Sequence, residues 1–308
     1  MSKAQHHQVT ASDGLRLHAV TYGDESATPV VLVHGYPDNH LVWEPVAERL
    51  AERYYVVAYD VRGAGRSESG RRIRDYRLDQ LGQDLAAVVD ALIPGRGFHL
   101  AAHDWGSIQS WESVTTSRLQ GRILSYTTIS GPCLDHAAHW MRRRLLTTQP
   151  GLLRQGLGQL ASSWYIVMFQ LPLLAPTLWQ TVLGRLWPAY LEHREGVKES
   201  TPSPTQTADG KEGVQLYRAN FVPKMIKPEQ RHAHCPVQLL VPTGDNYVNV
   251  GLFDDLTQRV PELYRRDIDA THWVPLSQPD LIAGWIDEFA RHIDGTETSA
   301  AVDAARVA

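Results

Sequence analysis

The stretch Phe98-His-Leu-Ala-Ala-His-Asp-Trp-Gly106 decides the fold class of this 308-residue chain. Residues 98–102 form a mostly apolar run that stops at a polar pair, which is typical of a strand buried on both faces of a parallel sheet. Small residues, Ala102 and Gly106, stand two positions before and after Asp104. They allow the backbone to turn sharply and to present the central side chain at the end of the strand. The stretch therefore predicts a strand, a tight turn and a helix, with Asp104 as a nucleophile.

Similar apolar runs recur along the chain and alternate with helical patterns. Buried strands are predicted at 30–33, 54–59, 98–102, 123–129, 237–241 and 264–268, with a half-buried antiparallel strand at 15–22. Helices are predicted at 43–52, 78–92, 106–118, 251–259 and 279–293. Strands that alternate with helices predict an α/β fold whose mostly parallel sheet is flanked by helices on both faces.

The alternation is interrupted once, between residues 134 and 230. This region contains helical stretches rich in proline and aromatic residues, and a polar segment at 200–213 that we expect to be a loop. The sequence thus predicts a discontinuous α/β core, 1–133 and 231–294, with an inserted, mainly helical cap at 134–230. Residues 295–308 are small and polar, and we expect a flexible tail.

Composition excludes several classes of protein. A net charge of −4 gives no electrostatic reason to expect nucleic acid as a partner. Hydrophobic residues at 43% and charged residues at 21% are ordinary for a globular enzyme. The two cysteines, Cys133 and Cys235, favour free thiols in a reducing, cytoplasmic compartment, although one bridge between them is conceivable. The first residues contain no apolar run, so no secretory signal is expected.

The most apolar segment, residues 164–179, raises the question of a membrane. It is shorter than the roughly 20 apolar residues that a spanning helix needs, and Gln170, Pro172 and Pro176 interrupt it. We therefore expect no integral span and place the segment in the cap. Peripheral contact with a membrane surface stays open, because the Arg142-Arg-Arg144 triplet lies nearby.

An aspartate nucleophile indicates the kind of bond that is attacked. A carboxylate that attacks a saturated carbon forms an ester, which an activated water can cleave beside an oxyanion hole, whereas a serine would leave a stable ether. With this elbow the chain resembles the α/β-hydrolase superfamily, in particular its branch of epoxide hydrolases and haloalkane dehalogenases.

Two further motifs carry the same resemblance. His34-Gly-Tyr-Pro37 matches the H-G-x-P motif of epoxide hydrolases. This match implies that the Tyr36 N–H is one oxyanion donor, with a cis bond before Pro37, and the Trp105 N–H is the other. Asp60-Val-Arg-Gly-Ala-Gly-Arg-Ser67 matches the family segment D-x-R-G-x-G-x-S, for which we expect a structural role.

A base and an acid complete the expected triad. His272 follows the last predicted strand, where the family has its base, and a histidine pKa near neutrality suits that role. Asp245 follows the strand at 237–241, and the order Asp104, Asp245, His272 is that of the superfamily. Some relatives have their acid where this chain has Tyr247, but a tyrosine cannot replace a carboxylate, so Asp245 is the predicted acid.

The cap is expected to supply the groups that hold the epoxide oxygen. Epoxide hydrolases use two cap tyrosines, and Tyr165 and Tyr217 stand in segments that resemble theirs, with Tyr190 as the fallback. Four large side chains are predicted to bind an apolar substrate: Trp105, Trp164, Phe169 and Trp273.

The resemblance therefore predicts an enzyme that converts an apolar epoxide and water into a vicinal diol, with no cofactor. No metal is expected, because the histidine pairs at 6–7, 136/139 and 232/234 lack further ligands at a supporting spacing. A dehalogenase with the same triad is the alternative, although Tyr36 and Trp105 stand where dehalogenases commonly have asparagine or arginine. A non-catalytic binding module is a further alternative.

Overall fold

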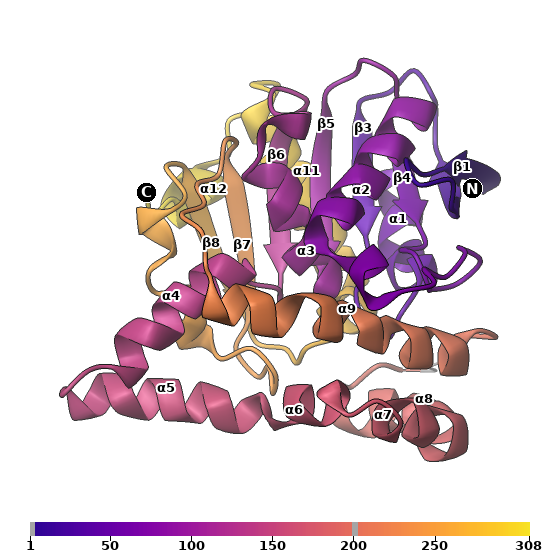
Figure 1. The fold of residues 1–308 in the computed structure, drawn as a ribbon. Helices are drawn as coiled ribbons and strands as arrows, with labels where there is room; N and C mark the ends of the chain where they lie inside the picture. Colours follow the sequence, from indigo (N-terminus) through magenta and orange to yellow (C-terminus); the bar gives the residue numbers. More distant parts are fainter. Residues whose placement is uncertain (1–3, 199–202) are drawn as a thin grey trace.

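An eight-stranded sheet forms the centre of the computed structural model, which describes residues 4–198 and 203–308 (Figure 1). The strands are β1 (Gln5–Thr10), β2 (Arg16–Tyr22), β3 (Pro29–Val33), β4 (Tyr55–Tyr59), β5 (Phe98–His103), β6 (Ile123–Ile129), β7 (Val237–Pro242) and β8 (Leu263–Ile268). Their order is β1-β2-β4-β3-β5-β6-β7-β8. Only the β1–β2 and β2–β4 pairs are antiparallel. The predicted, mostly parallel sheet is thereby confirmed.

Helices cover both faces of this sheet. The core helices are α1 (Glu44–Leu50), α2 (Leu78–Leu92), α3 (Trp105–Val114), α10 (Val274–Ser277) and α11 (Pro279–Ile293). Helices α1 and α11 pack on one face, and α2 and α3 pack on the other. Strands β3, β4, β5 and β7 are buried along their whole length, which explains their continuous apolar runs.

Short 3₁₀ turns connect several elements: η1 (His40–Trp43), η2 (Ile73–Tyr76), η3 (Ser117–Leu119), η5 (Val250–Phe253) and η6 (Leu256–Gln258). The last two replace the helix predicted at 251–259. The apolar periodicity there comes from buried side chains on two separate turns, Leu252 and Phe253 on η5 and Leu256 on η6. Strand β1 was not predicted, since only Val9 is buried in it and its polar face gives little signal.

The cap lies between β6 and β7, which are neighbours in the sheet. Its helices are α4 (Leu134–Leu145), α5 (Pro150–Ser162), α6 (Trp164–Gln170), α7 (Leu174–Leu178), α8 (Gly184–Arg194) and α9 (Gln206–Ile226), with a π-helical segment η4 (Trp179–Leu183). Figure 1 shows these helices gathered at the carboxyl ends of the strands, with α9 nearest to the sheet and α5 to α8 as an outer layer.

The loop predicted at 200–213 is wrong from Gln206 onward, where α9 begins; residues 200–202 lie outside the described residues. Two glycines in that segment serve close packing and do not form a turn. A Cβ on Gly210 would lie 2.2 Å from the Trp179 ring, and one on Gly213 would lie 2.5 Å from the Tyr36 ring. At these two positions the helix can approach Trp179 in the cap and Tyr36 in the core only because it has no side chain there.

The flexible tail predicted at 295–308 is also wrong. Residues Ala300–Ala305 form helix α12, and the Ser299 hydroxyl caps it by accepting the Val302 N–H. Val302 is fully buried against Tyr264 and Phe289, and Arg306 forms a bridge to Tyr264 in β8. One buried valine and a strand-like pairing fix a segment whose composition alone indicates disorder.

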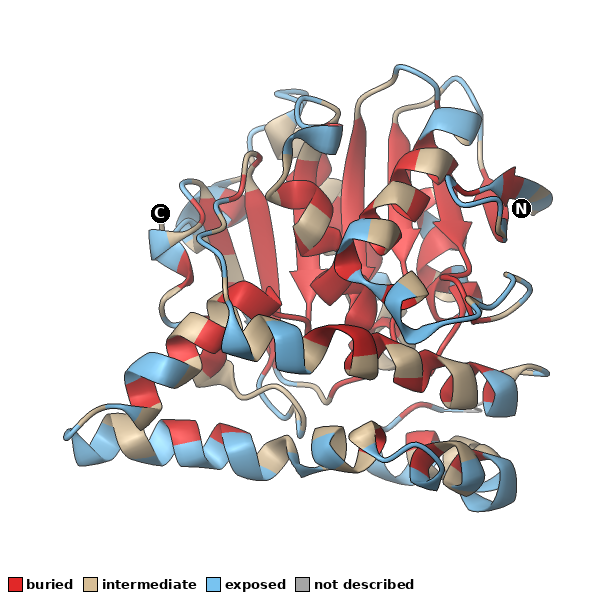
Figure 2. Cartoon of the chain, in the orientation of Figure 1, coloured by how far each residue is buried: buried red, intermediate tan, exposed pale blue. Residues whose placement is uncertain are grey.

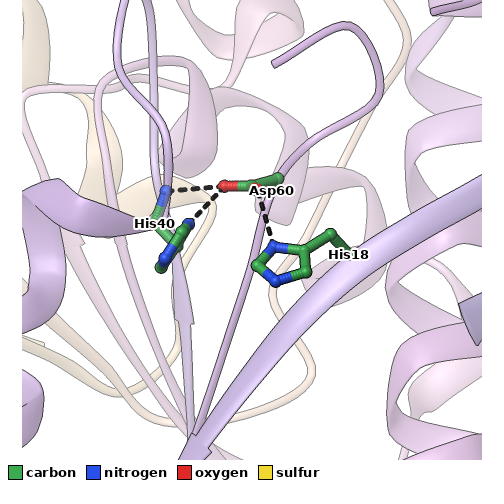
Figure 3. A group of neighbouring side chains, drawn as sticks. All are labelled: His18, His40 and Asp60. Atoms are coloured by element: carbon green, nitrogen blue, oxygen red, sulfur yellow. Dashed lines mark hydrogen bonds and ion pairs between the residues drawn. The ribbon is translucent and has the colours of Figure 1, made fainter. Parts of the chain in front are cut away.

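A buried cluster anchors the loop that follows β4 (Figure 3). The Asp60 carboxylate accepts hydrogen bonds from His18 Nδ1 at 2.8 Å, His40 Nδ1 at 2.6 Å and the Arg66 N–H at 2.9 Å. Burial would raise the pKa of Asp60, but its histidine partners lower it well below the usual range. Each imidazole thus directs its Nδ1 at one oxygen of the Asp60 carboxylate. This geometry accords with the structural role predicted for the Asp60–Ser67 motif.

Figure 2 shows that the central strands of the sheet are buried, whereas much of the outer cap layer, α5 to α8, is exposed. No single helix among the described residues is long and apolar enough to cross a membrane; α6 and the 174–194 segment meet the length and composition test together, but with a bend of 100°.

Both cysteines, Cys133 and Cys235, are free and buried, and burial raises the pKa of each thiol to about 12.

Candidate active site

Asp104 lies at the turn between β5 and α3, as predicted from the sequence. Its backbone has φ 52° and ψ −124°, a conformation that non-glycine residues rarely adopt. Neighbouring residues must be small for this turn to fit. A Cβ on Gly106 would lie 2.1 Å from the Val33 carbonyl oxygen, and one on Gly131 would lie 2.3 Å from the Asp104 carbonyl oxygen. The strained turn places the Asp104 carboxylate beyond the carboxyl end of the sheet.

The loop after β3 brings a backbone donor to this carboxylate. The Tyr36 N–H donates a hydrogen bond of 2.6 Å to Asp104 Oδ1, and the Tyr36–Pro37 peptide bond is cis, as expected. Gly35 permits the approach, because a Cβ there would lie 2.4 Å from the same oxygen. The Trp105 N–H, the second expected donor, belongs to the first turn of α3 directly after Asp104. The Tyr36 N–H thus lies beside the carboxylate, where it can stabilise an oxyanion that develops on an Asp104 ester.

The two other expected triad residues converge on Asp104 from the loops after β7 and β8. His272 Nε2 lies 3.5 Å from Asp104 Oδ2, and His272 Nδ1 lies 2.9 Å from Asp245 Oδ2. The other Asp245 oxygen accepts the N–H groups of Tyr247 and Val248, at 2.7 and 3.1 Å. A carboxylate on Nδ1 fixes the tautomer, so Nε2 faces the nucleophile.

Charge coupling sets the protonation of this trio. Burial alone would lower the pKa of His272, but the carboxylates of Asp245 and Asp104 raise it well above the usual value. Burial would raise the pKa of Asp245, and His272 lowers it. The opposing carboxylates therefore favour the charged imidazolium form of His272.

The two predicted cap tyrosines line the same cavity as Asp104. About 620 Å³ of empty space lies in this cavity between core and cap, and part of that space is open to solvent. Burial raises the pKa of both the Tyr165 and the Tyr217 phenol above the ordinary value, and so does the nearby negative charge of Asp104. Both phenols thus keep their protons and can act as donors. Most of the remaining lining is apolar: Trp105, Ile108, Pro132, Leu134, Ala137, Met141, Ile166, Phe221, Met225, Val248 and Leu252.

Three of the four predicted substrate-binding residues do not line this cavity. Trp164 lies on the outside of the cap with 65% of its surface exposed. Phe169 packs behind the cap tyrosines, with its ring centroid 4.8 Å from that of Tyr217. Trp273 lies behind His272, and its indole N–H donates to Asp38 at 2.8 Å. Only Trp105 of the four faces the cavity. Residue type alone does not show which side of a helix a side chain is on, so the sequence could not separate cavity-facing aromatic residues from the others.

Several residues near the site were not identified as functional from the sequence. Tyr247, considered only as a misplaced acid, lines the cavity, and its ring centroid lies 5.0 Å from that of His272. The hydroxyl of Tyr190, the fallback residue, contacts the Tyr247 hydroxyl at 2.5 Å and the Glu195 carboxylate at 2.9 Å. Asp38 is buried, which raises its pKa to about 7. Asp38 could have been identified from the sequence because it directly follows the H-G-Y-P motif.

The comparisons with known proteins agree with this geometry. The sequence profile of the alpha/beta hydrolase fold family matches residues 28–279, which is most of the chain. This protein belongs to the α/β-hydrolase fold family.

Named relatives extend the similarity of this α/β hydrolase. It is 34% identical over 97% of its length to the probable oxidoreductase EphD of Mycobacterium tuberculosis, but it spans only 52% of that protein. It is 26% identical to epoxide hydrolase 3 of Xenopus tropicalis, covering 93% of this chain and 78% of the relative. Among solved structures, it is similar to an epoxide hydrolase from Bacillus megaterium with a TM-score of 0.76 and 18% identity, covering 92% of this chain and all of that one. The structural similarity establishes the fold.

Proposed function

We propose that this α/β hydrolase is an epoxide hydrolase that forms a covalent ester on Asp104 and releases a vicinal diol. The observation that carries the proposal is the arrangement of one cavity. It contains the carboxylate of Asp104, with the base His272 3.5 Å away, and the phenols of Tyr165 and Tyr217. Relatives named as epoxide hydrolases support the assignment.

Ring opening is the first step. Asp104 attacks one oxirane carbon, a C–O bond forms, and the C–O bond of the ring breaks. The electron pair goes to the epoxide oxygen, which takes a proton from a cap phenol, Tyr165 or Tyr217. Their raised pKa values keep these phenols protonated in the resting enzyme. The product of this step is a hydroxyalkyl ester on Asp104.

Ester hydrolysis is the second step, and the first step prepares it. Esterification removes the negative charge of Asp104, one of the two carboxylates that raise the pKa of His272. The imidazolium then releases its proton to solvent more readily, and the neutral imidazole that remains is a base. It takes a proton from water, and the hydroxide adds to the ester carbonyl beside the N–H groups of Tyr36 and Trp105. The bond from the ester carbonyl carbon to the diol oxygen then breaks, and that oxygen takes a proton from the His272 imidazolium as the diol leaves. The Asp104 carboxyl returns a proton to His272 and becomes a carboxylate again, and the phenolate regains its proton from solvent.

The cavity supports an apolar epoxide as the substrate. Its walls carry leucine, isoleucine, methionine and aromatic side chains, with few polar groups besides Asp104 and the tyrosines. Burial of apolar substrate surface contributes about 25 cal/mol per Å² to binding. We therefore expect epoxides with a bulky hydrocarbon substituent to bind more tightly than small polar ones.

Carbon–halogen cleavage by the same triad is less well supported. The side chain of Tyr36, which stands where dehalogenases commonly have asparagine, is already engaged. Its hydroxyl donates to the Gly210 carbonyl at 2.9 Å and accepts the indole N–H of Trp179. It is thus committed to holding the cap and is not free to bind a departing halide.

The variant His272→Gln tests the proposal. Without a base for the second step, we expect the ester on Asp104 to accumulate, visible by mass spectrometry as an increase equal to the mass of the substrate. The double variant His272→Gln with Asp104→Ala is the matched control and must show no increase. A panel of terminal, internal and fatty-acid epoxides beside haloalkanes, assayed for diol and halide, distinguishes the two reactions. Full turnover by His272→Gln would exclude the proposed role of His272.

A further inference from the structure

The outer layer of the cap carries apolar side chains that face solvent. Nine of them, in α5, α6, α7, η4, α8 and the turn before α7, are more than 40% exposed: Leu157, Leu160, Trp164, Val167, Leu171, Leu173, Leu174, Val182 and Leu186. We call these nine residues the outer stripe. Figure 1 shows that the helices concerned form the layer furthest from the sheet. Exposed apolar groups in such a run on a folded protein indicate a surface that another body covers.

The spacing of the outer stripe shows that it is one face of nearly continuous helix. Positions 157, 160, 164, 167 and 171 recur every three or four residues, and the Ser163 N–H donates to the Gln159 carbonyl across the α5–α6 junction. The opposite face, which includes Gln159, Tyr165 and Ile166, lines the cavity beside Asp104. These helices are therefore apolar on both sides, and packing against the core accounts for only one side.

Charge in this region has a single sign. Between Asp135 and Glu192 the sequence contains no acidic residue and five arginines, whereas the whole chain has a net charge of −4. Arg144 is buried and pairs with Asp254 and Asp255, and Arg143 also pairs with Asp255. Arg154 and Arg185 are exposed at either end of the outer stripe, and no ion pair to either is found among residues 4–198 and 203–308.

We propose that the outer stripe docks this protein onto the surface of an anionic phospholipid bilayer, with Arg154 and Arg185 on lipid phosphates. Aliphatic side chains and Trp164 enter the boundary between headgroups and acyl chains, while flanking arginines attract anionic lipid. The lack of acidic residues over this face favours an anionic surface over a protein partner of ordinary mixed charge. The contact is peripheral, and the proposal is independent of the reaction at Asp104.

Vesicle flotation of the 308-residue chain tests this docking. The probes are vesicles of phosphatidylcholine alone and vesicles with roughly one third phosphatidylglycerol. We expect binding to the second kind, and a loss of about 25-fold for Arg154→Gln with Arg185→Gln, since each arginine near an anionic surface contributes about fivefold. For Val167→Glu with Leu173→Glu we expect a loss of at least about tenfold. Higher salt should weaken binding by the intact chain.

Matched controls separate docking from general surface effects. Ile73→Glu with Val307→Glu changes two apolar side chains that are each 50% exposed but lie outside the cap, and it should bind vesicles as the unchanged chain does. Equal binding to both kinds of vesicle, or binding that survives both cap variants, would overturn the proposal. So would a chain that does not float and instead forms a dimer that Val167→Glu with Leu173→Glu dissociates. Diol formation is measured separately, so failure of the reaction and failure of docking are distinguishable.

Discussion

The two halves of the candidate site, one from the core and one from the cap, are held in different ways. Hydrogen bonds and ion pairs fix the core half: Tyr36 N–H on Asp104, and Asp245 on His272. Aromatic packing fixes the cap half: the Tyr217 ring makes edge contacts with Tyr36, Trp105 and others, at centroid separations of 4.8 to 5.9 Å. Directional bonds position reacting atoms closely, whereas packing tolerates larger changes of shape. We infer that the core half holds the attacking carboxylate and the base more rigidly than the cap half holds the two phenol donors.

The largest effect is expected in the core half, for Asp245→Asn. An amide cannot hold the reactive tautomer of His272, and loss of a triad carboxylate lowers kcat by roughly 10³–10⁴-fold in comparable sites. Because Asp245 raises the pKa of His272, its removal lowers that pKa. The base acts when neutral, so kcat rises with pH through this pKa, and the rising limb should move to lower pH in the variant.

A pH–rate profile of both proteins checks this prediction. Asp254→Asn is the control, since Asp254 is a carboxylate of the same region without contact to His272. A variant whose profile keeps the original midpoint would show that Asp245 does not control the base, and the contrast between the two halves would lose its main support.

A smaller effect is expected in the cap half, for Tyr165→Phe with Tyr217→Phe. The rings and their edge contacts remain, so the fold is retained, but both donors to the epoxide oxygen are lost. Loss of such donors costs roughly 10²–10³-fold. We expect this loss in the rate of ester formation, measured by mass in the His272→Gln background. Tyr22→Phe, a buried tyrosine in β2, is the control. Unchanged ring opening in the double variant would remove the main reason to prefer epoxides.

The smallest effect concerns the join between the halves. Asn220 in α9 accepts the Leu78 N–H at 2.9 Å and donates to the Tyr76 carbonyl at 2.8 Å, so it ties the cap to the core. Asn220→Ala leaves a buried N–H without its partner and should lower the free energy of unfolding by about 1–3 kcal/mol. Urea unfolding measures this change in the free energy of unfolding, and Gln120→Ala, at an exposed position, is the control. A change below a few tenths of a kcal/mol would show that the Asn220 hydrogen bonds do not stabilise the attachment of the cap.

Sequence reasoning succeeded where the chain is locally constrained. The elbow around Asp104, the H-G-Y-P loop and the buried parallel strands are each specified by neighbouring residues, because sharp turns demand small side chains and doubly buried strands demand apolar runs. It failed at Gly210 and Gly213, where composition predicted a loop but distant aromatic rings require glycine in a helix. It failed again at α12, where the burial of Val302 outweighs a disordered composition.

The sequence by itself determined the α/β class, the position of Asp104 at the strand-to-helix turn and the likeness of the triad to a known superfamily, since these depend on local pattern and on the order of residues along the chain. Only the tertiary structure decided which cap side chains face Asp104. It turned Tyr165 inward and Trp164, its neighbour, outward with 65% exposure. Adjacent residues on a helix point about 100° apart, and the face that meets the core is set by packing across the whole cap.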